Sequence, residues 1–372
     1  MEFKDKDKFS LDTPCLILDL DILEGNLHRM QEIAGSAGKD LRPHAKTHKC
    51  SILARKQIET GAIGICAAKV SEAAALAKEG VPGILITGPV ATPAKIEKLI
   101  DLLQSAPSTM IVVDHPKAIE LLSDALRDRG LSMDVLLDID VGLERTGVAP
   151  ELAPQLARAI LSHENLKLRG IQAYAGQIQH ISSFEERKST SIACLQDAVS
   201  VFRELSREIE SCTIFSASGT GTFDIDLAVP EITELQLGSY ACMDAQYMSI
   251  GSAGDPGRFT AFGPALRLLS SVVSANQRGF VTVDAGLKSL YSDGAIPRVI
   301  RPEGKGLVYD WFGDEYGMIK ATNEEDLPPL GSVLELIVSH CDPTINLFDR
   351  FFITRGDQVV DIWPIDLRGC SR

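Results

Sequence analysis

The sequence predicts an α/β protein in which a (β/α)8 TIM-type barrel is joined to a second, mostly β domain. Strand-like and helix-like segments alternate from about residue 22 to 240, which is the pattern of parallel βαβ units. From about residue 259 the chain instead offers short β-branched or apolar runs, separated by glycine, proline and charged turns. The length of 372 residues fits a barrel of about 250 residues plus a second domain.

Eight strand-like segments make up the expected barrel, after a helix over residues 23–37. They cover residues 41–45, 62–67, 83–87, 110–113, 134–139, 167–173, 212–217 and 234–237. Helical patterns separate them at residues 51–60, 71–79, 93–103, 116–129, 151–162 and 184–210. In a barrel of this type the chemistry lies at the C-terminal ends of the strands.

The second domain is expected to hold five further β segments, and the glycine-rich stretch 251–258 marks its boundary with the barrel. The segments cover residues 265–273, 279–284, 333–339, 349–354 and 358–362. Near the N-terminus, residues 12–18 form an additional apolar segment with the pattern of a strand.

Composition and charge exclude several classes of protein. The formal net charge of -14 argues against a nucleic-acid or anionic-membrane surface, because both require a basic face. The chain has no run of about 18 apolar residues, so we expect no membrane span, and residues 1–14 lack the apolar core of a secretory signal. Eight scattered cysteines without a CxxC pair indicate reduced thiols and a cytoplasmic location.

Residues 41–49 contain the leading candidate for a functional residue, Lys46. Pro43 biases the preceding residue toward an extended conformation, so residues 41–45 resemble a short strand. Thr47 is expected to N-cap the helix over residues 51–60, which places Lys46 at a strand-to-helix junction at the mouth of the barrel. On these residues alone, a surface lysine beside a phosphate or nucleic acid remains an open alternative.

The segment RPHAKTHK resembles the pyridoxal-phosphate lysine motif of the D-threonine aldolase and D-serine dehydratase family, which has the alanine-racemase-like fold of type III pyridoxal-phosphate enzymes. Further similar segments follow one another in order over nearly the whole chain, at residues 12–21, 64–73, 140–148, 218–222, 283–293 and 339–347. The resemblance implies that Lys46 forms a Schiff base with pyridoxal phosphate and that the protein is a homodimer. It also implies a barrel domain over residues 22–255 and a β domain made of residues 1–21 and 256–372.

Two glycine-rich loops are candidates for holding the phosphate of this cofactor, because barrels frequently place a phosphate site after strands 7 and 8. The first loop is Ser218, Gly219, Thr220, Gly221 and Thr222, and the second is Gly238, Ser239 and Tyr240. Flexible loops without a ligand are the alternative. The resemblance further assigns Arg145 to cofactor contact and places Tyr174 against the pyridine ring, whereas a solvated loop arginine is the alternative for Arg145.

His180 lies shortly after Tyr174, and an imidazole can accept a proton close to neutral pH. We therefore expect His180 to deprotonate the β-hydroxyl group of a substrate. The alternative is that His180 caps the helix that begins near residue 182.

The segment His340-Cys341-Asp342 is the candidate metal site. If it continues a strand, His340 and Asp342 share one face and can bind one ion while Cys341 points away. Imidazole plus carboxylate suits Mn²⁺ or Zn²⁺, with Mg²⁺ as a further option. By resemblance, His-x-Asp is typical of aldolase-like members and His-x-Cys of dehydratase-like members.

These residues and the resemblance imply a lyase that cleaves a D-3-hydroxy-α-amino acid, such as D-threonine, into glycine and an aldehyde. A D-serine or D-3-hydroxyaspartate dehydratase is the nearest alternative, and a non-catalytic pyridoxal-phosphate carrier is an alternative of another class. Ala68, Gly88, Pro89 and Tyr316 depart from the residues expected at these positions in the family, which leaves the exact substrate open.

Overall fold

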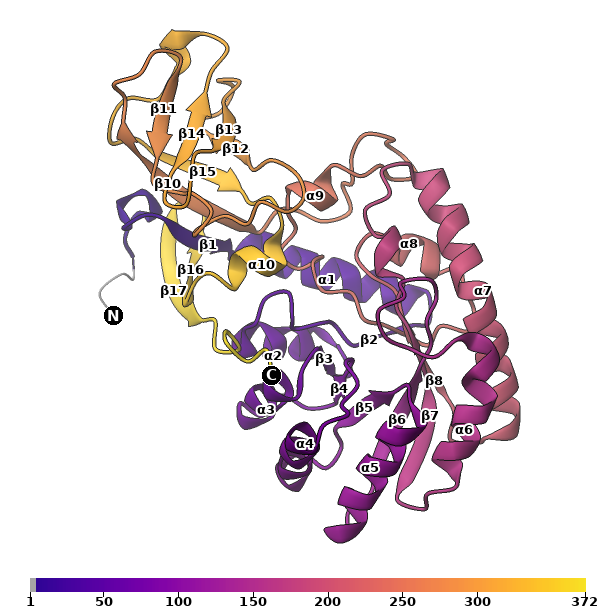
Figure 1. Ribbon diagram of the computed structural model, residues 1–372. Helices are drawn as coiled ribbons and strands as arrows, with labels where there is room; N and C mark the ends of the chain where they lie inside the picture. The colour runs from indigo at the N-terminus through magenta and orange to yellow at the C-terminus, as the bar shows by residue number, and fades with distance from the viewer. Residues whose placement is uncertain (1–4) are drawn as a thin grey trace. The chain divides into compact units, whose positions relative to one another are not determined.

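The computed structural model describes residues 5–372, which form two compact units (Figure 1). The barrel unit comprises Arg29–Lys46, Ser51–Gly238 and Gly369–Arg372. The β unit takes its described residues from Met1–His28, Thr47–Cys50 and Ser239–Arg368. Helix α1 (Leu20–Ser36) contributes residues to both. The domain bounds expected from the sequence, residues 22–255 for the barrel and residues 1–21 with 256–372 for the β domain, stay a prediction.

The barrel unit confirms the expected (β/α)8 barrel. Among the described residues, its sheet has eight parallel strands in the order β2-β9-β8-β7-β6-β5-β4-β3. Their bounds are β2 (Asp40–Leu41), β3 (Ile65–Ala67), β4 (Ile84–Ile86), β5 (Met110–Val113), β6 (Met133–Asp138), β7 (Leu166–Ala173), β8 (Ile214–Ala217) and β9 (Glu234–Leu235). A parallel bridge between His44 and Cys66 joins the two ends of this order and closes the barrel.

The strands of the barrel unit are short apolar runs, as expected for a parallel sheet that is covered on both faces. All four residues of β5 are buried. Five buried side chains from neighbouring strands pack together in one core cluster: Cys66, Leu85, Met110, Val112 and Leu136.

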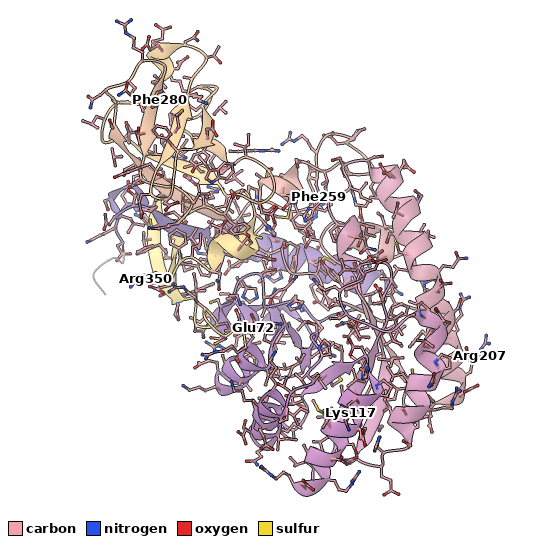
Figure 2. The ribbon with its side chains drawn as sticks, in the orientation of Figure 1. Glu72, Lys117, Arg207, Phe259, Phe280 and Arg350 are labelled. Carbon is pink, nitrogen blue, oxygen red and sulfur yellow. The ribbon has the colours of Figure 1, made fainter. Side chains whose placement is uncertain are left out.

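Helices alternate with these strands and lie on the outside of the sheet (Figure 1). They are α2 (Ser51–Thr60), α3 (Val70–Lys78), α4 (Pro93–Ser105), α5 (Pro116–Asp128), α6 (Ala153–Leu161), α7 (Phe184–Glu208) and the short α8 (Phe223–Asp226). Prolines open α4 and α5, where the missing N–H group costs no helical hydrogen bond. Glu72, labelled in Figure 2, lies in the first turn of α3. Its buried carboxylate accepts a hydrogen bond from the Ala68 N–H group at 2.8 Å.

The expectation that Thr47 caps α2 is wrong. Helix α2 begins at Ser51, whereas Thr47 lies in a turn over residues 45–48. Three residues lie between the two positions, whereas an N-cap residue directly precedes its helix. The Thr47 hydroxyl instead contacts Asp342 in the β unit.

The β unit confirms a second, mostly β part of the chain. Its strands are β1 (Cys15–Asp19), β10 (Leu266–Ser274), β11 (Phe280–Val283), β12 (Arg298–Arg301), β13 (Val308–Trp311), β14 (Gly317–Lys320), β15 (Val333–Ile337), β16 (Arg350–Arg355) and β17 (Gln358–Pro364). The N-terminal strand β1 pairs antiparallel with β10 and parallel with β16. The short helices α9 (Ala245–Met248) and α10 (Cys341–Ile345) also belong to this unit.

Three strands of the β unit, β12 to β14, fall outside the segments that the sequence predicted. Each has only four residues, and each includes exposed or half-buried positions. Their hydrophobic pattern is therefore too weak and too short to identify them.

Within residues 5–372, no helix has the length and apolar character that crossing a membrane requires.

A buried ion pair fixes the first strand of the barrel against the last. Arg42 Nε and Nη2 donate to the two carboxylate oxygens of Glu234, each at 2.9 Å. Arg42 also donates to the Gly83 carbonyl, and both members of the pair are buried. A bidentate contact of this kind balances the two charges and also fixes the register of the first strand against the last.

We expect Arg42→Met to lower the free energy of unfolding by about 3–5 kcal/mol, because it leaves the Glu234 carboxylate buried without its cation. Guanidinium chloride unfolding measures this loss. Lys117→Met is the control, since Lys117 pairs with Glu120 at 2.7 Å on the exposed face of α5 and should matter little (Figure 2). Equal losses in the two variants would contradict a special role for the buried pair.

Candidate active site

Lys46 lies where the first barrel strand ends, as the sequence predicted. Backbone hydrogen bonds join this strand to its two neighbours. The His44 N–H group donates to the Leu237 carbonyl at 3.2 Å, and the Ala45 N–H group donates to the Cys66 carbonyl at 2.9 Å. The next amide, that of Lys46, donates instead to His44 Nδ1 at 3.3 Å. Lys46 is thus the first residue to leave the ladder, at the C-terminal edge of the barrel.

Tyr174 brings two cationic side chains together in the barrel unit. Lys46 Nζ lies 5.6 Å from the centroid of the Tyr174 ring, and the guanidinium carbon of Arg145 lies 5.9 Å from the same centroid. Tyr174 directly follows β7, so three different strand ends contribute to this cluster. Two cations beside an aromatic face are suited to a planar, anionic ligand.

The loop that carries Arg145 is held by carboxylates. Asp140 Oδ1 accepts the N–H groups of Gly142, Leu143 and Glu144 at 3.0 to 3.1 Å, and Asp114 accepts that of Gly147 at 3.2 Å. Residues of this loop line an open cavity of about 380 Å³. Arg145 therefore projects from an ordered loop beside an accessible cavity.

Asp138, at the end of β6, is a buried carboxyl group in the same barrel. Its Oδ1 accepts a hydrogen bond from Gln172 Nε2 at 2.9 Å, whereas its Oδ2 is buried and has no hydrogen-bond partner among residues 5–372. Burial raises the pKa of Asp138 to about 6, although Gln172 and the Thr146 hydroxyl partly offset this effect. No sequence pattern identified Asp138 beyond its place near a strand end.

The loop Ser218 to Thr222 follows β8, the seventh barrel strand in chain order, as predicted. Its glycines are required by close packing, because a Cβ atom would lie 2.4 Å from Gln179 Oε1 at Gly219 and 2.0 Å from the Gln179 carbonyl at Gly221. Ser218 adopts a φ of 79°, in the left-handed region. The hydroxyl-bearing residues Ser218, Thr220 and Thr222 are all buried.

Three residues that the sequence analysis missed hold this loop in place. Gln179 accepts the Gly221 N–H at 2.9 Å and donates to Thr222 Oγ1 at 3.1 Å. Arg187 Nε donates to the Gly221 carbonyl at 2.7 Å, and Asp226 accepts the Thr222 hydroxyl at 2.5 Å. Gly221 and Thr222 therefore help to stabilise the loop itself, and the role of Ser218 to Thr222 in phosphate binding stays a prediction.

A sequence signal for two of these residues exists. Arg187 is a charged residue on the buried face of α7, and Asp226 lies four residues after Thr222, the N-cap of α8, at the last position of this short helix. Burial raises the pKa of Asp226, and hydrogen bonds from Ser191 and Thr222 partly offset the shift.

His180 lies directly after Gln179, in a turn between Gly176–Ile178 and α7, and is half-buried. The alternative that His180 caps α7 is wrong. The N-cap is Ser183, whose hydroxyl accepts the Glu186 N–H at 3.3 Å. His180 therefore remains a candidate proton acceptor beside the loop that Gln179 holds.

The second glycine-containing loop is divided between the two units. Gly238 ends a segment of the barrel unit, whereas Ser239 and Tyr240 belong to the β unit. The Ser239 carbonyl accepts the Met243 N–H at 2.7 Å, and the buried Tyr240 ring packs edge-on against Phe262 at 5.6 Å between centroids. A role for these three residues in phosphate binding stays a prediction.

The candidate metal residues lie in the β unit, but they do not lie on a strand as expected. Strand β15 ends at Ile337, His340 is the N-cap of α10, and Asp342 lies in the first turn of that helix. Pro343 is compatible with a first turn, where its missing N–H group is not needed. Strand alternation therefore does not explain how His340 and Asp342 could act together.

Buried polar groups hold this turn. Asp244 accepts the N–H groups of Cys341 at 2.9 Å and Tyr247 at 2.8 Å, and it is fully buried. Asp342 Oδ1 accepts the Thr47 hydroxyl at 3.3 Å. Asp342 Oδ2 is buried and has no hydrogen-bond partner among the described residues.

This unsatisfied oxygen fits a metal ion, because buried carboxylates are otherwise paired or hydrogen-bonded. Within residues 5–372, no group of three or more His, Cys, Asp or Glu side chains could hold a metal ion. His340 and Asp342 would thus supply two ligands and leave further positions for water and substrate. The cluster of Lys46, Arg145 and Tyr174, with the neighbouring hydroxyl-rich loop, fits an anionic aromatic cofactor in the same way.

Comparison with known proteins agrees with these features. Residues 18–245 match the family model "Alanine racemase, N-terminal domain", and residues 265–354 match "Putative serine dehydratase domain". The chain is 38% identical over 363 residues to a D-threonine aldolase from Arthrobacter sp, covering 97% of this chain and 94% of that protein. It is 35% identical over 370 residues to a 3-hydroxy-D-aspartate aldolase from Paracoccus denitrificans strain Pd 1222, covering 98% and 94%.

A solved structure gives the same result. The crystal structure of D-threonine aldolase from Filomicrobium marinum superimposes with a TM-score of 0.93 at 35% identity and covers 100% of both chains. The chain therefore belongs to the D-threonine aldolase and D-serine dehydratase family of pyridoxal-phosphate-dependent lyases, which have the alanine-racemase-like fold.

Proposed function

We propose that this lyase cleaves a D-3-hydroxy-α-amino acid, D-threonine or a close analogue, into glycine and an aldehyde, with the help of a divalent metal ion. The observation that carries the proposal is Asp342, the carboxylate of the His340-x-Asp342 motif, with its buried and unsatisfied oxygen. Identity to two aldolases of this kind supports the same choice. Ala68, Gly88, Pro89 and Tyr316 leave the side chain of the substrate open.

In this proposal the barrel unit holds pyridoxal phosphate. Lys46 would attach the cofactor, Tyr174 and Arg145 would contact it, and the loop from Ser218 to Thr222 would receive its phosphate. Bound pyridoxal phosphate acts as an electron sink for the Cα atom of an attached amino acid.

The metal site is supplied by His340 and Asp342. Mn²⁺ is the leading candidate, with Zn²⁺ and Mg²⁺ as further options. A divalent ion lowers the pKa of a hydroxyl group that it binds. Thr47, which contacts Asp342, directly follows Lys46 in the chain.

His180 is the proposed base. It accepts the proton of the substrate β-hydroxyl, and the electrons of that O–H bond form the aldehyde C=O bond as the Cα–Cβ bond breaks. A proton delivered to Cα then gives glycine.

Two further properties belong to this proposal. The resemblance to the family supports a homodimer, and the scattered cysteines support a cytoplasmic location.

Incubation of the purified protein with D-threonine should yield glycine and acetaldehyde, because cleavage between Cα and Cβ produces these two compounds. Chromatography and an aldehyde assay measure them. Formation of 2-oxobutyrate and ammonia would instead identify a dehydratase, and the absence of any product would favour a different substrate or a carrier. L-Threonine is the control and should not react.

Sodium borohydride should fix pyridoxal phosphate permanently to Lys46, because reduction makes the cofactor–lysine bond stable. Peptide mapping by mass spectrometry locates the adduct, and Lys46→Ala should lose the visible absorbance of the cofactor. Lys117→Ala, a change on the exposed face of α5, should keep both. An adduct on another lysine would overturn the assignment.

Chelation should stop turnover while the absorbance of the cofactor and the melting temperature stay unchanged, because the proposed ion acts on the substrate hydroxyl. Activity should return with Mn²⁺. Asp342→Ala should weaken Mn²⁺ binding by more than about 100-fold, since it removes one of two protein ligands. The control Asp349→Ala changes an exposed acid of the same unit and should bind Mn²⁺ normally.

Full cleavage of D-threonine by the metal-free protein would eliminate this mechanism. A melting temperature that falls in step with activity would indicate that the ion stabilises the fold instead.

A further inference from the structure

A chain of buried and part-buried hydrogen bonds crosses the barrel unit and ends at Lys46. Asp138 Oδ1 accepts from Gln172 Nε2 at 2.9 Å, and the same amide nitrogen lies 3.3 Å from the Thr87 carbonyl. Thr87 Oγ1 lies 3.0 Å from His44 Nε2, and His44 Nδ1 accepts the Lys46 N–H at 3.3 Å. The chain thus links the ends of four strands, β6, β7, β4 and the first strand.

These contacts fix the protonation state of His44. A backbone N–H group can only donate, so the Nδ1 atom that receives the Lys46 amide carries no proton. The proton of the neutral ring is therefore on Nε2, which donates to Thr87 Oγ1. The Thr87 hydroxyl in turn donates to the Ala67 carbonyl at 3.3 Å, so every donor in the series has an acceptor.

The His44 ring also determines where the first strand ends. A side chain that accepts the N–H group of the second residue after it forms a local turn, as Asn and Asp do in Asx-turns. Ala45 is the last ladder donor in this strand, and residues 45–48 form a turn. Because the ring is buried and bonded at both nitrogens, it cannot rotate without losing two hydrogen bonds.

We propose that His44 is the positioning residue for Lys46, and that Thr87, supported by Gln172 and Asp138, holds His44 in the tautomer that this role requires. The inference rests on the proposed function in one respect, since Lys46 is the residue expected to carry pyridoxal phosphate. His44 acts through the backbone of Lys46, and the direction in which the lysine side chain leaves the barrel edge follows from that backbone.

A matched pair of variants distinguishes the role of His44 Nδ1 from that of His44 Nε2. In His44→Asn, the amide oxygen takes the place of Nδ1 and can still accept the Lys46 N–H, but the shorter side chain does not reach Thr87. In His44→Gln, the amide reaches toward Thr87 but offers no acceptor at the place of Nδ1. The two substitutions are otherwise similar in polarity and size.

Hydrogen exchange of the Lys46 amide, the dissociation constant of pyridoxal phosphate and the melting temperature should be measured for both variants of the full-length protein. We expect His44→Asn to keep the Lys46 amide protected and His44→Gln to lose protection by about 3- to 10-fold, the change that one lost hydrogen bond gives. His44→Gln should also bind the cofactor more weakly than His44→Asn at a similar melting temperature. Equal protection and equal cofactor affinity in the two variants would overturn the proposal.

Thr87 provides a second test if a His44 variant does not fold. Thr87→Val removes the acceptor for His44 Nε2 with little change in volume, whereas Thr87→Ser retains it. The Lys46 amide should exchange faster in Thr87→Val than in Thr87→Ser. Identical exchange in these two variants would show that Thr87 does not hold the tautomer.

The amide measurement also distinguishes this inference from the proposed function. If borohydride fixes no cofactor on Lys46 of the wild-type protein, the proposed function fails. The difference in Lys46 amide exchange between His44→Asn and His44→Gln decides the role of His44 in either case.

Discussion

The closure of the barrel at its first strand is the constraint on which the candidate site depends. This strand has a proline at position 43, which cannot donate a ladder hydrogen bond, so the Pro43 carbonyl and the Ala45 amide provide its contacts to Cys66. Buried side chains supply the remaining constraint. Arg42 is paired with Glu234 on the last strand, and His44 holds the amide at which the ladder ends. The placement of Lys46 follows from these contacts, because its backbone is fixed by the strand that it terminates.

Buried polar groups near the candidate site differ in whether their hydrogen-bonding atoms are all engaged within the protein. Gln179 and Asp226 are engaged with the glycine-rich loop, which explains their burial without any ligand. Asp342 has one oxygen engaged with Thr47 and the other buried and unsatisfied. An unsatisfied carboxylate oxygen is unfavourable in a folded protein unless a proton or a cation compensates it. The unsatisfied oxygen of Asp342 therefore supports the proposal that this residue binds a metal ion.

The sequence predicted the barrel well because its strands and helices are encoded locally. The apolar run at residues 110–113 and the helix that begins at Pro116 appear at the positions expected for them.

Contacts between distant segments were not predictable in this way. Thr47 was expected to cap a nearby helix but contacts Asp342, which is 295 residues away. His340 and Asp342 were expected on a strand, yet the apolar pattern of β15 stops at Ile337 and a short helix follows. Gln179 escaped notice because a loop contact across about 40 residues leaves no periodic pattern.

The carboxylate at position 342, in the first turn of α10, bears on which metal ion the proposed site would bind. Helix α10 starts directly after His340, and Asp244 fixes the Cys341 amide, so Cys341 is fully buried within the β unit while Asp342 offers a free oxygen. The two proposed metal ligands, His340 and Asp342, are then an imidazole and a carboxylate, and no thiolate is among them. Oxygen ligands favour harder ions such as Mn²⁺ and Mg²⁺, whereas a thiolate favours Zn²⁺. Two ligands from one short turn would also leave most coordination positions open, which suits the proposed role of the ion in binding a substrate hydroxyl.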